Sequence, residues 1–201
     1  NVKTFANIME FCKENNIKHF FYASSSSVYG NDNNFSEKFF QKNVSSIYAA
    51  TKVCNEIFAN VYNYLYGINT LGLRFFTVYG PYGREDMAYY KFLNEIKTRN
   101  KIIIYGGKKS IRSFTYIDDA VYSVILLIKK FSKKNFYNEC INIGNNKKNS
   151  LNDLIKCIRK YYSNSFNEKV IQRNKSDVFK TQSSINKLKK NINFYPNTKL
   201  E

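Results

Sequence analysis

The stretch Ser45-Ser46-Ile47-Tyr48-Ala49-Ala50-Thr51-Lys52 opens a strongly periodic helical segment. Tyr48 and Lys52 are four residues apart, which puts both side chains on one face of a helix, one above the other. A phenol has a pKa of about 10 and is a poor base at neutral pH, but a nearby ammonium favours its ionised form. The spacing therefore indicates a tyrosine able to take a proton from a hydroxyl group, and a solvated helix face is the plain alternative.

A strand and a cluster of hydroxyl groups precede this helix. Phe20-Phe21-Tyr22-Ala23 predicts a buried strand that runs into Ser24-Ser25-Ser26-Ser27-Val28-Tyr29-Gly30. Open α/β sheets place ligand-binding groups at the carboxyl ends of their strands. A strand, a serine cluster and a Tyr-x-x-x-Lys helix in this order resemble the short-chain dehydrogenase/reductase superfamily. The serine run is similar to its extended branch, the nucleotide-sugar epimerases and dehydratases.

Strand and helix patterns alternate along the rest of the chain, which predicts an α/β fold with a largely parallel sheet. We expect a partial Rossmann-like sheet with a smaller C-terminal lobe that binds substrate. Residues 1–83 and 118–145 would form the later part of an NAD-binding domain, and 84–117 and 146–201 the lobe. The expected strands are 17–23, 70–78, 102–105, 113–117, 137–143 and 170–171. The expected helices are 1–15, 47–66, 88–99, one capped by Asp118 or Asp119, one after a capping box at Ser150–Asp153, and 184–190.

The glycine pattern is as informative as the motifs. The chain has eight glycines, and they form no G-x-G-x-x-G turn of the kind that opens a dinucleotide-binding fold. The chain is thus similar to the later part of an extended reductase. We expect the first mononucleotide-binding half to lie outside these 201 residues.

Composition limits the other classes of function. The net charge of +17 fits a polyanionic partner, but the basic residues are dispersed and no RNA-binding aromatic motif is present, so we expect no nucleic acid. His19 is the only histidine, which excludes a histidine metal cluster, and we expect no bound metal. The four cysteines have no paired spacing and predict reduced thiols in a cytoplasmic protein. No apolar run reaches membrane-spanning length, so we expect no membrane partner.

Three further blocks resemble the UDP-glucuronate 4-epimerases within this family. They run from Leu73 to Ala88, from Arg112 to Val121 and from Asn142 to Asn145. The resemblance implies transient oxidation of the sugar at C4 with bound NAD, followed by reduction from the opposite face. It also implies a homodimer of the full-length protein through the helices 1–15 and 47–66.

The resemblance assigns roles to twelve residues. Ser25 would bond the sugar 4-hydroxyl, Tyr48 would be the general base, and Lys52 would hold the nicotinamide ribose. The implied NAD contacts are Ser24, Tyr48, Lys52 and Phe76. The implied UDP-sugar contacts are Ser26, Ser27, Thr77 and Arg84 near the carboxylate, Arg112 on the diphosphate, Tyr105 at the uracil and Asp177 near the uridine. Each has a structural alternative; Ser26 and Ser27, for example, could simply satisfy backbone groups at a strand end.

A few sequence positions distinguish the epimerases from related enzymes with other activities. Related dehydratases and decarboxylases carry Glu or Asp-Glu where this chain has Ser26 and Ser27, and a hydroxyl cannot act as a carboxylate base. UDP-glucose and UDP-N-acetylhexosamine 4-epimerases stay as alternatives, and Arg84 is the discriminating residue. An inactive fragment of such an enzyme is a further alternative, for which we expect negligible affinity for NAD.

Overall fold

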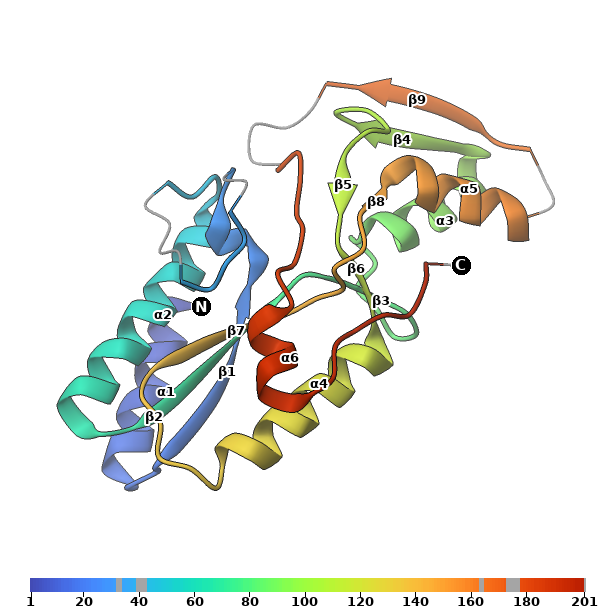
Figure 1. Ribbon diagram of the computed structural model, residues 1–201. Coiled ribbons are helices and arrows are strands. Elements are labelled where there is room, and N and C mark those ends of the chain that lie inside the picture. The colour runs from blue at the N-terminus through green and yellow to red at the C-terminus, as the bar shows by residue number, and fades with distance from the viewer. Residues whose placement is uncertain (32–33, 39–42, 163–164, 173–177, 201) are drawn as a thin grey trace.

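The computed structural model describes residues 1–31, 34–38, 43–162, 165–172 and 178–200. A parallel sheet in the order β1-β2-β7 lies between two layers of helices (Figure 1). The predicted α/β fold with parallel strands is confirmed. The strands of this sheet are β1 (His19–Ser25), β2 (Asn69–Phe75) and β7 (Glu139–Ile143). The helices beside it are α1 (Val2–Glu14), α2 (Ile47–Tyr66), α4 (Ile117–Phe131) and α6 (Asn186–Ile192).

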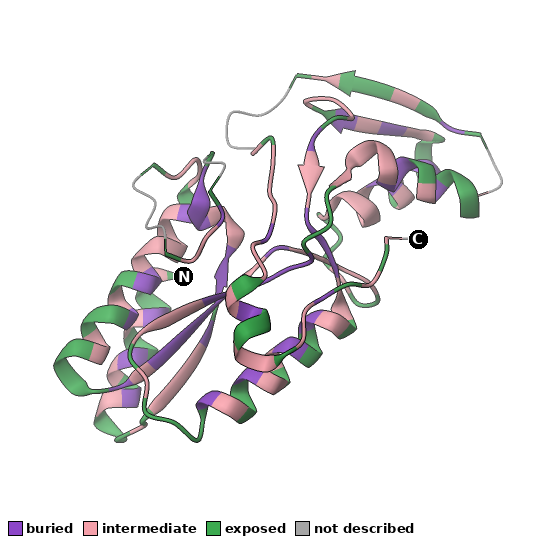
Figure 2. Ribbon diagram, viewed as in Figure 1, coloured by how far each residue is buried: buried purple, intermediate pink, exposed green. Residues whose placement is uncertain are grey.

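Each face of the sheet has its own hydrophobic core, because successive strand residues point to opposite faces. On one face Tyr22 of β1 packs with Phe5 and Met9 of α1. On the other face Leu71 of β2 packs with Leu127 of α4. Figure 2 shows buried residues along the strands and exposed residues along the outer sides of the helices.

The predicted strand 70–78 is wrong in one respect, because the chain breaks it at Phe76. The strand β2 ends at Phe75, and β3 (Thr77–Tyr79) then leaves the sheet and pairs with β6 (Phe114–Tyr116). The Phe76 N–H donates to the carbonyl of Ile143 at 3.1 Å, and its ring is buried. A Cβ on Gly144 would lie 2.8 Å from the Phe76 ring, so only glycine leaves room for it. The break turns Thr77 away from the sheet.

A second group of elements follows this break. The parallel pair β4 and β9 packs on α3 and α5 around Phe92, Ile102 and Ile155. A short antiparallel pair, β5 with β8, lies beside them. The bounds are α3 (Ala88–Arg99), β4 (Lys101–Tyr105), β5 (Ile111–Arg112), β8 (Asn149–Ser150), α5 (Leu151–Tyr161) and β9 (Asn167–Ile171).

The first residues of α5 and α4 can be compared with the N-caps that the sequence predicts. The capping box at the start of α5 is confirmed, since Ser150 and Asp153 bond each other's backbone N–H groups. The expected cap of α4 is wrong, because Tyr116 is the N-cap residue and Asp119 lies within the first turn. The Asp119 carboxylate instead accepts from the N–H groups of Asn197 and Thr198 at 3.0 and 2.9 Å.

The division into an NAD-binding part and a lobe stays a proposal. The helix α6 belongs to the segment 146–201 assigned to the lobe, yet its Leu188 is buried in the core formed by β2, β7 and α4. The last described residues cross between α4 and the second group, which ties the two groups together (Figure 1).

Candidate active site

The serine cluster lies where β1 ends. The strand stops at Ser25, and the 3-10 turn η1 (Ser26–Tyr29) begins there because the Ser25 Oγ accepts from the Ser27 N–H at 3.2 Å. The Ser25 hydroxyl also donates to the Ser27 Oγ at 3.1 Å. The turn therefore fixes two hydroxyl groups side by side at the carboxyl end of the strand.

Tyr48 and Lys52 reach the same place from the first two turns of α2. Ser46 caps this helix by accepting from the Ala49 N–H at 3.1 Å. The Lys52 ammonium lies 5.8 Å from the centre of the Tyr48 ring and donates to the Ala23 carbonyl at 2.9 Å. The predicted Tyr-x-x-x-Lys face is thus turned toward the end of β1.

One cavity of about 500 Å³ brings most of the predicted residues together. Its walls come from the end of β1, the start of α2, the break after β2 and the loop after β3. The predicted residues that line it are Ser24, Ser25, Ser26, Ser27, Tyr48, Lys52, Phe76, Thr77 and Arg84. Residues that sequence reasoning missed also line it: Tyr79, Tyr82, Met87, Tyr89 and Ile117. The described part of this lining contains no carboxylate.

Ser24 differs from its neighbours, because its hydroxyl points away from this space. The side chain is 3% exposed and donates to Glu56 Oε1 at 2.6 Å. Any contact of Ser24 with a cofactor would therefore be made by its backbone.

Arg84 stands on the exposed loop that follows β3. Its guanidinium donates to both oxygens of Asp86, at 2.9 Å and 2.5 Å. The side chains are 74% and 64% exposed, so solvent screens the pair. The hydrogen bonds raise the pKa of Arg84 and lower the pKa of the Asp86 carboxyl. Arg84 thus lies at the cavity wall, and its guanidinium is already bonded to the Asp86 carboxylate.

Tyr105 and Arg112 line a second, adjoining cavity of about 270 Å³, which shares Thr77 and Met87 with the first. The Lys91 ammonium lies 4.4 Å from the centre of the Tyr105 ring. Arg112 donates to the carbonyls of Ile111 and Phe179 at 3.0 and 3.1 Å. The two cavities together extend from Tyr48 to the edge of β4, and Asp177 lies outside the described residues.

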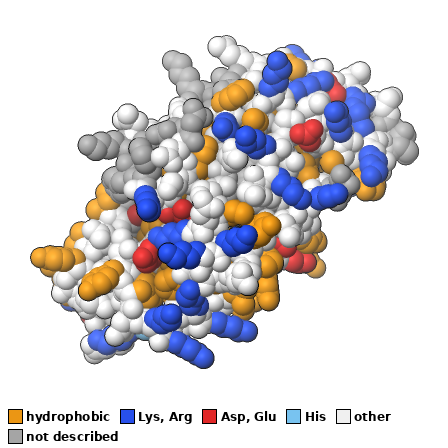
Figure 3. Space-filling model, viewed as in Figure 1, with side chains coloured by type: hydrophobic (Ala, Val, Ile, Leu, Met, Phe, Trp, Pro, Cys, Tyr) orange, Lys and Arg blue, Asp and Glu red, His pale blue; other side chains and the backbone are white. Residues whose placement is uncertain are grey.

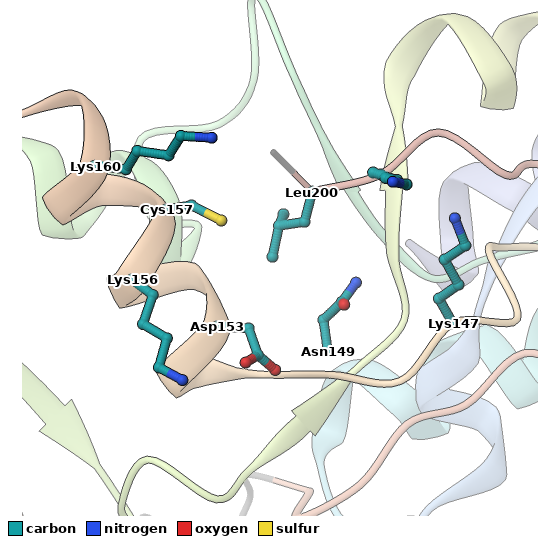
Figure 4. Close-up of a pocket in the computed structure, with 8 residues that line it drawn as sticks. Lys147, Asn149, Asp153, Lys156, Cys157, Lys160 and Leu200 are labelled. Atoms are coloured by element: carbon teal, nitrogen blue, oxygen red, sulfur yellow. The ribbon is translucent and has the colours of Figure 1, made fainter.

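A third hollow, of about 540 Å³, lies between α5 and the C-terminal residues Lys199 and Leu200 and contains none of the predicted residues (Figure 4). Its lining is rich in lysine: Lys147, Asn149, Asp153, Lys156, Cys157, Lys160, Lys199 and Leu200. Basic side chains are also spread over the face of the molecule that Figure 3 shows, and they do not gather in one patch.

Two classes of site are absent from the described part of the chain. No group of three or more His, Cys, Asp or Glu side chains there could hold a metal ion. Within those same residues, no helix combines the length and apolar character needed to cross a membrane.

Comparison with known proteins gives a consistent result. The model of the NAD dependent epimerase/dehydratase family matches residues 1–144. An uncharacterised protein of Methanocaldococcus jannaschii is 41% identical over 197 residues, covering 97% of this chain and 59% of the relative. A UDP-glucuronate 4-epimerase of Thermodesulfobacterium geofontis is 34% identical over 203 residues, covering 100% of this chain and 61% of the relative.

Solved structures agree with these relatives. The crystal structure of UDP-glucuronic acid 4-epimerase from Bacillus cereus in complex with UDP-glucuronic acid and NAD superposes with a TM-score of 0.92 at 29% identity. The match covers 99% of this chain and 63% of that one. This chain therefore spans less than two thirds of the length of each of these three proteins.

Proposed function

Because the chain belongs to the NAD dependent epimerase/dehydratase family, we propose that it supplies the catalytic and sugar-binding part of a UDP-glucuronate/UDP-galacturonate 4-epimerase. The observation that carries this proposal is the meeting of Ser25, Tyr48 and Lys52 at one cavity, with Arg84 on its wall. The crystallised Bacillus cereus relative, which holds UDP-glucuronic acid and NAD, supports the same substrate and cofactor.

The residues around Tyr48 suit the nicotinamide end of NAD. A phenol, an ammonium and the buried ring of Phe76 line one side of a cavity at a strand end, which is where open α/β sheets bind such groups. When bound, NAD would supply the acceptor and donor of the hydride at sugar C4. Lys52 would hold the ribose, and its hydrogen bond to Ala23 shows that the ammonium can reach the strand end.

The chain's own residues would move the proton. Tyr48 would take the proton of the sugar 4-hydroxyl as C4 is oxidised, and would return it once the sugar has turned over in the cavity. Ser25 would hold the 4-oxygen by a hydrogen bond, with its hydroxyl already oriented by Ser27.

The uronate carboxylate would be held on the other side of the same cavity. The 4-keto uronate is a β-keto acid, which is prone to losing carbon dioxide. Arg84, Thr77 and the hydroxyl groups of Ser26 and Ser27 would keep the carboxylate out of line with the ketone. Since the described lining has no carboxylate to act as a base at C5, the site favours epimerisation over dehydration.

The nucleotide would extend into the adjoining cavity. Arg112 would meet the diphosphate with its planar guanidinium, and Tyr105 would lie near the uracil. Asp177 keeps its proposed place near the uridine, outside the described residues.

We also propose that the full-length protein is a cytoplasmic homodimer. Large apolar side chains on the outer sides of α1 and α2 are exposed, including Phe11 at 57%, Leu65 at 58% and Tyr64 at 85%. Hydrophobic side chains are visible along this edge of the molecule in Figure 3. Such a surface suits a self-complementary interface. None of the four cysteines, all of them among the described residues, forms a disulfide bond, as in a reducing compartment.

The test is an assay of the protein as its gene encodes it, with NAD and UDP-glucuronate. We expect UDP-galacturonate as product and no UDP-pentose. Turnover of UDP-glucose or UDP-N-acetylglucosamine at a higher kcat/KM would favour the neutral-sugar epimerases instead. Calorimetry of the 201-residue chain with NAD tests the fragment alternative, for which we expect negligible affinity because the glycine-rich phosphate turn is missing from the sequence.

A further inference from the structure

A buried ion pair lies directly behind the serine cluster. Arg74 on β2 donates from Nε and Nη2 to the two carboxylate oxygens of Glu56 on α2, at 2.9 and 2.7 Å. The two side chains are 4% and 5% exposed. Burial opposes the charged form of Arg74, but the hydrogen bonds and charge of Glu56 outweigh it, and the pKa of Arg74 is raised.

The remaining polar atoms of the pair are also bonded. Glu56 Oε1 accepts a second hydrogen bond from the Ser24 hydroxyl at 2.6 Å. The Arg74 Nη1 donates to the Tyr29 phenol at 2.9 Å, and the Tyr29 hydroxyl donates to Asn142 Oδ1 at 2.7 Å. One network therefore joins α2, β1, β2, η1 and β7, which are the elements that surround the end of β1.

The network touches the helix at a particular place. Glu56 is four residues after Lys52 and eight after Tyr48, so the three side chains follow one another along one face of α2. Lys52 bonds the Ala23 carbonyl, and Glu56 bonds the hydroxyl of the next residue, Ser24. The helix is thus bound to β1 at two consecutive turns. The second bond uses the Ser24 hydroxyl and leaves only the Ser24 backbone for the proposed contact with the cofactor, and Glu56 itself has no proposed contact with it.

We propose that Glu56 and Arg74 are positioning residues that set the rotation and height of α2, and with them the place of the Tyr48 phenol relative to Ser25. The inference rests on the proposed function for its effect on the reaction. Packing alone does not explain the pair, because desolvating two charges is costly and apolar side chains of similar volume often stabilise a fold equally well. The two parallel hydrogen bonds from Arg74 to Glu56 fix the orientation of the two side chains, which apolar contacts do not.

The test separates position from stability in the gene-encoded protein. The double variant Glu56→Leu/Arg74→Met removes both charges and leaves neither one buried alone. We expect its free energy of unfolding to stay close to that of the wild type. We expect kcat to fall on the order of 10²-fold, as for a misplaced catalytic group, with KM for UDP-glucuronate little changed. A stable double variant with the wild-type kcat would overturn the inference.

A matched control removes stability without touching the network. Leu127 on α4 is completely buried on the opposite face of the sheet. Leu127→Ala should lower the free energy of unfolding and leave kcat unchanged at a temperature where the protein stays folded. Loss of kcat in this control equal to that of the double variant would show that activity follows stability alone, and would also overturn the inference.

Two further measurements keep the test decisive. If the double variant does not fold, Tyr29→Phe removes a single oxygen from the network; we expect kcat to fall about fivefold, and a full wild-type kcat counts against the inference. If the wild type epimerises none of the UDP-sugars, the proposed function fails, and hydrogen exchange decides the structural part. Faster amide exchange over residues 23–29 and 47–55 in the folded variants, relative to Leu127→Ala, supports the positioning role. Unchanged exchange there overturns it.

Discussion

Two arginine–carboxylate pairs near the same cavity are built in opposite ways: Arg84 lines the cavity, whereas Glu56 and Arg74 lie behind its serine cluster. The pair Glu56–Arg74 is about 5% exposed and shares its atoms with Ser24 and Tyr29. The pair Arg84–Asp86 is 74% and 64% exposed and sits on a loop. Both have forked geometry, with bonds of 2.5 to 2.9 Å.

The two pairs differ in how easily the arginine can give up its carboxylate partner. An exposed pair contributes about 0–1 kcal/mol and can give up its partner to a competing carboxylate. Breaking a buried pair costs about 3–5 kcal/mol because one charge is left without a partner. In the proposed reaction, the buried pair would hold the fixed geometry that proton transfer needs, and at the exposed pair a charged group of the substrate would replace a protein group.

The largest effect should come from the phenol of Tyr48, which lies on the same side of the cavity as the buried network. Tyr48→Phe removes the proposed base and keeps the ring, so kcat should fall by about 10² to 10⁴-fold. The phenol is 45% exposed, so the free energy of unfolding should hardly change. Steady-state kinetics with UDP-glucuronate and urea unfolding of the same sample measure both. Wild-type turnover would remove the proton-transfer role from this side of the cavity.

The exposed side should control the choice of sugar rather than the chemistry. Arg84→Ala removes a charge-assisted contact of about 1.5–3 kcal/mol, so kcat/KM for UDP-glucuronate should fall about 10- to 150-fold. For a neutral UDP-hexose the change should stay within about threefold, because no carboxylate needs the arginine. Equal losses on both substrates would mean that Arg84 shapes the loop and does not select the uronate.

The sequence predicts the cluster of Ser25, Tyr48 and Lys52 better than it predicts the ion pair Glu56–Arg74 that lies behind this cluster. Tyr48 and Lys52 are linked by helical spacing, and Ser25 follows a strand whose carboxyl end faces that helix, so short-range rules bring the three together. Short-range rules do not predict the burial of Glu56, since a charged residue on a helix is usually exposed to solvent. The available signal was Arg74, an isolated charge in an apolar strand, which requires a buried partner.

The exposed side and the break between strands depend on contacts that sequence patterns do not contain. Nothing in the apolar run 70–78 marks an end at Phe76, because the break arises from the Ile143 carbonyl and the space over Gly144. Only family resemblance implies nucleotide contacts for Tyr105 and Arg112, and the cavity that they line is formed by segments far apart in the chain. The short-range cap at Ser150 was predictable, whereas the partners of Asp119 come from the distant residues 197 and 198.

Alkaline pH should weaken the buried network through the Tyr29 phenol, which bonds Arg74 and Asn142. Burial raises the pKa of Tyr29 to about 12, against the attraction of Arg74. Below the unfolded pKa of about 10 the contribution of Tyr29 to stability is complete. As the pH rises from there toward the folded pKa of about 12, the unfolded chain loses the proton first and stability falls.

The measurement is the free energy of unfolding across this window. Tyr29→Phe should flatten the decline by up to about 1.4 kcal/mol per pH unit, the share of one proton. Leu127→Ala is the control, because it removes no titrating group and should lower stability without changing the slope. An identical slope in the wild type and Tyr29→Phe would show that the network does not titrate in this range.

The smallest effect should come from freeing Arg84. Asp86→Asn removes the carboxylate that now occupies the guanidinium, so a uronate would no longer compete with a protein group for it. KM for UDP-glucuronate should fall by up to about fivefold with kcat unchanged, since the exposed pair is weak. The gain should disappear in Arg84→Ala/Asp86→Asn, because the two substitutions act through one contact. A rise in KM would mean instead that Asp86 holds Arg84 in the orientation that the substrate needs, and the exposed side would then be preorganised like the buried one.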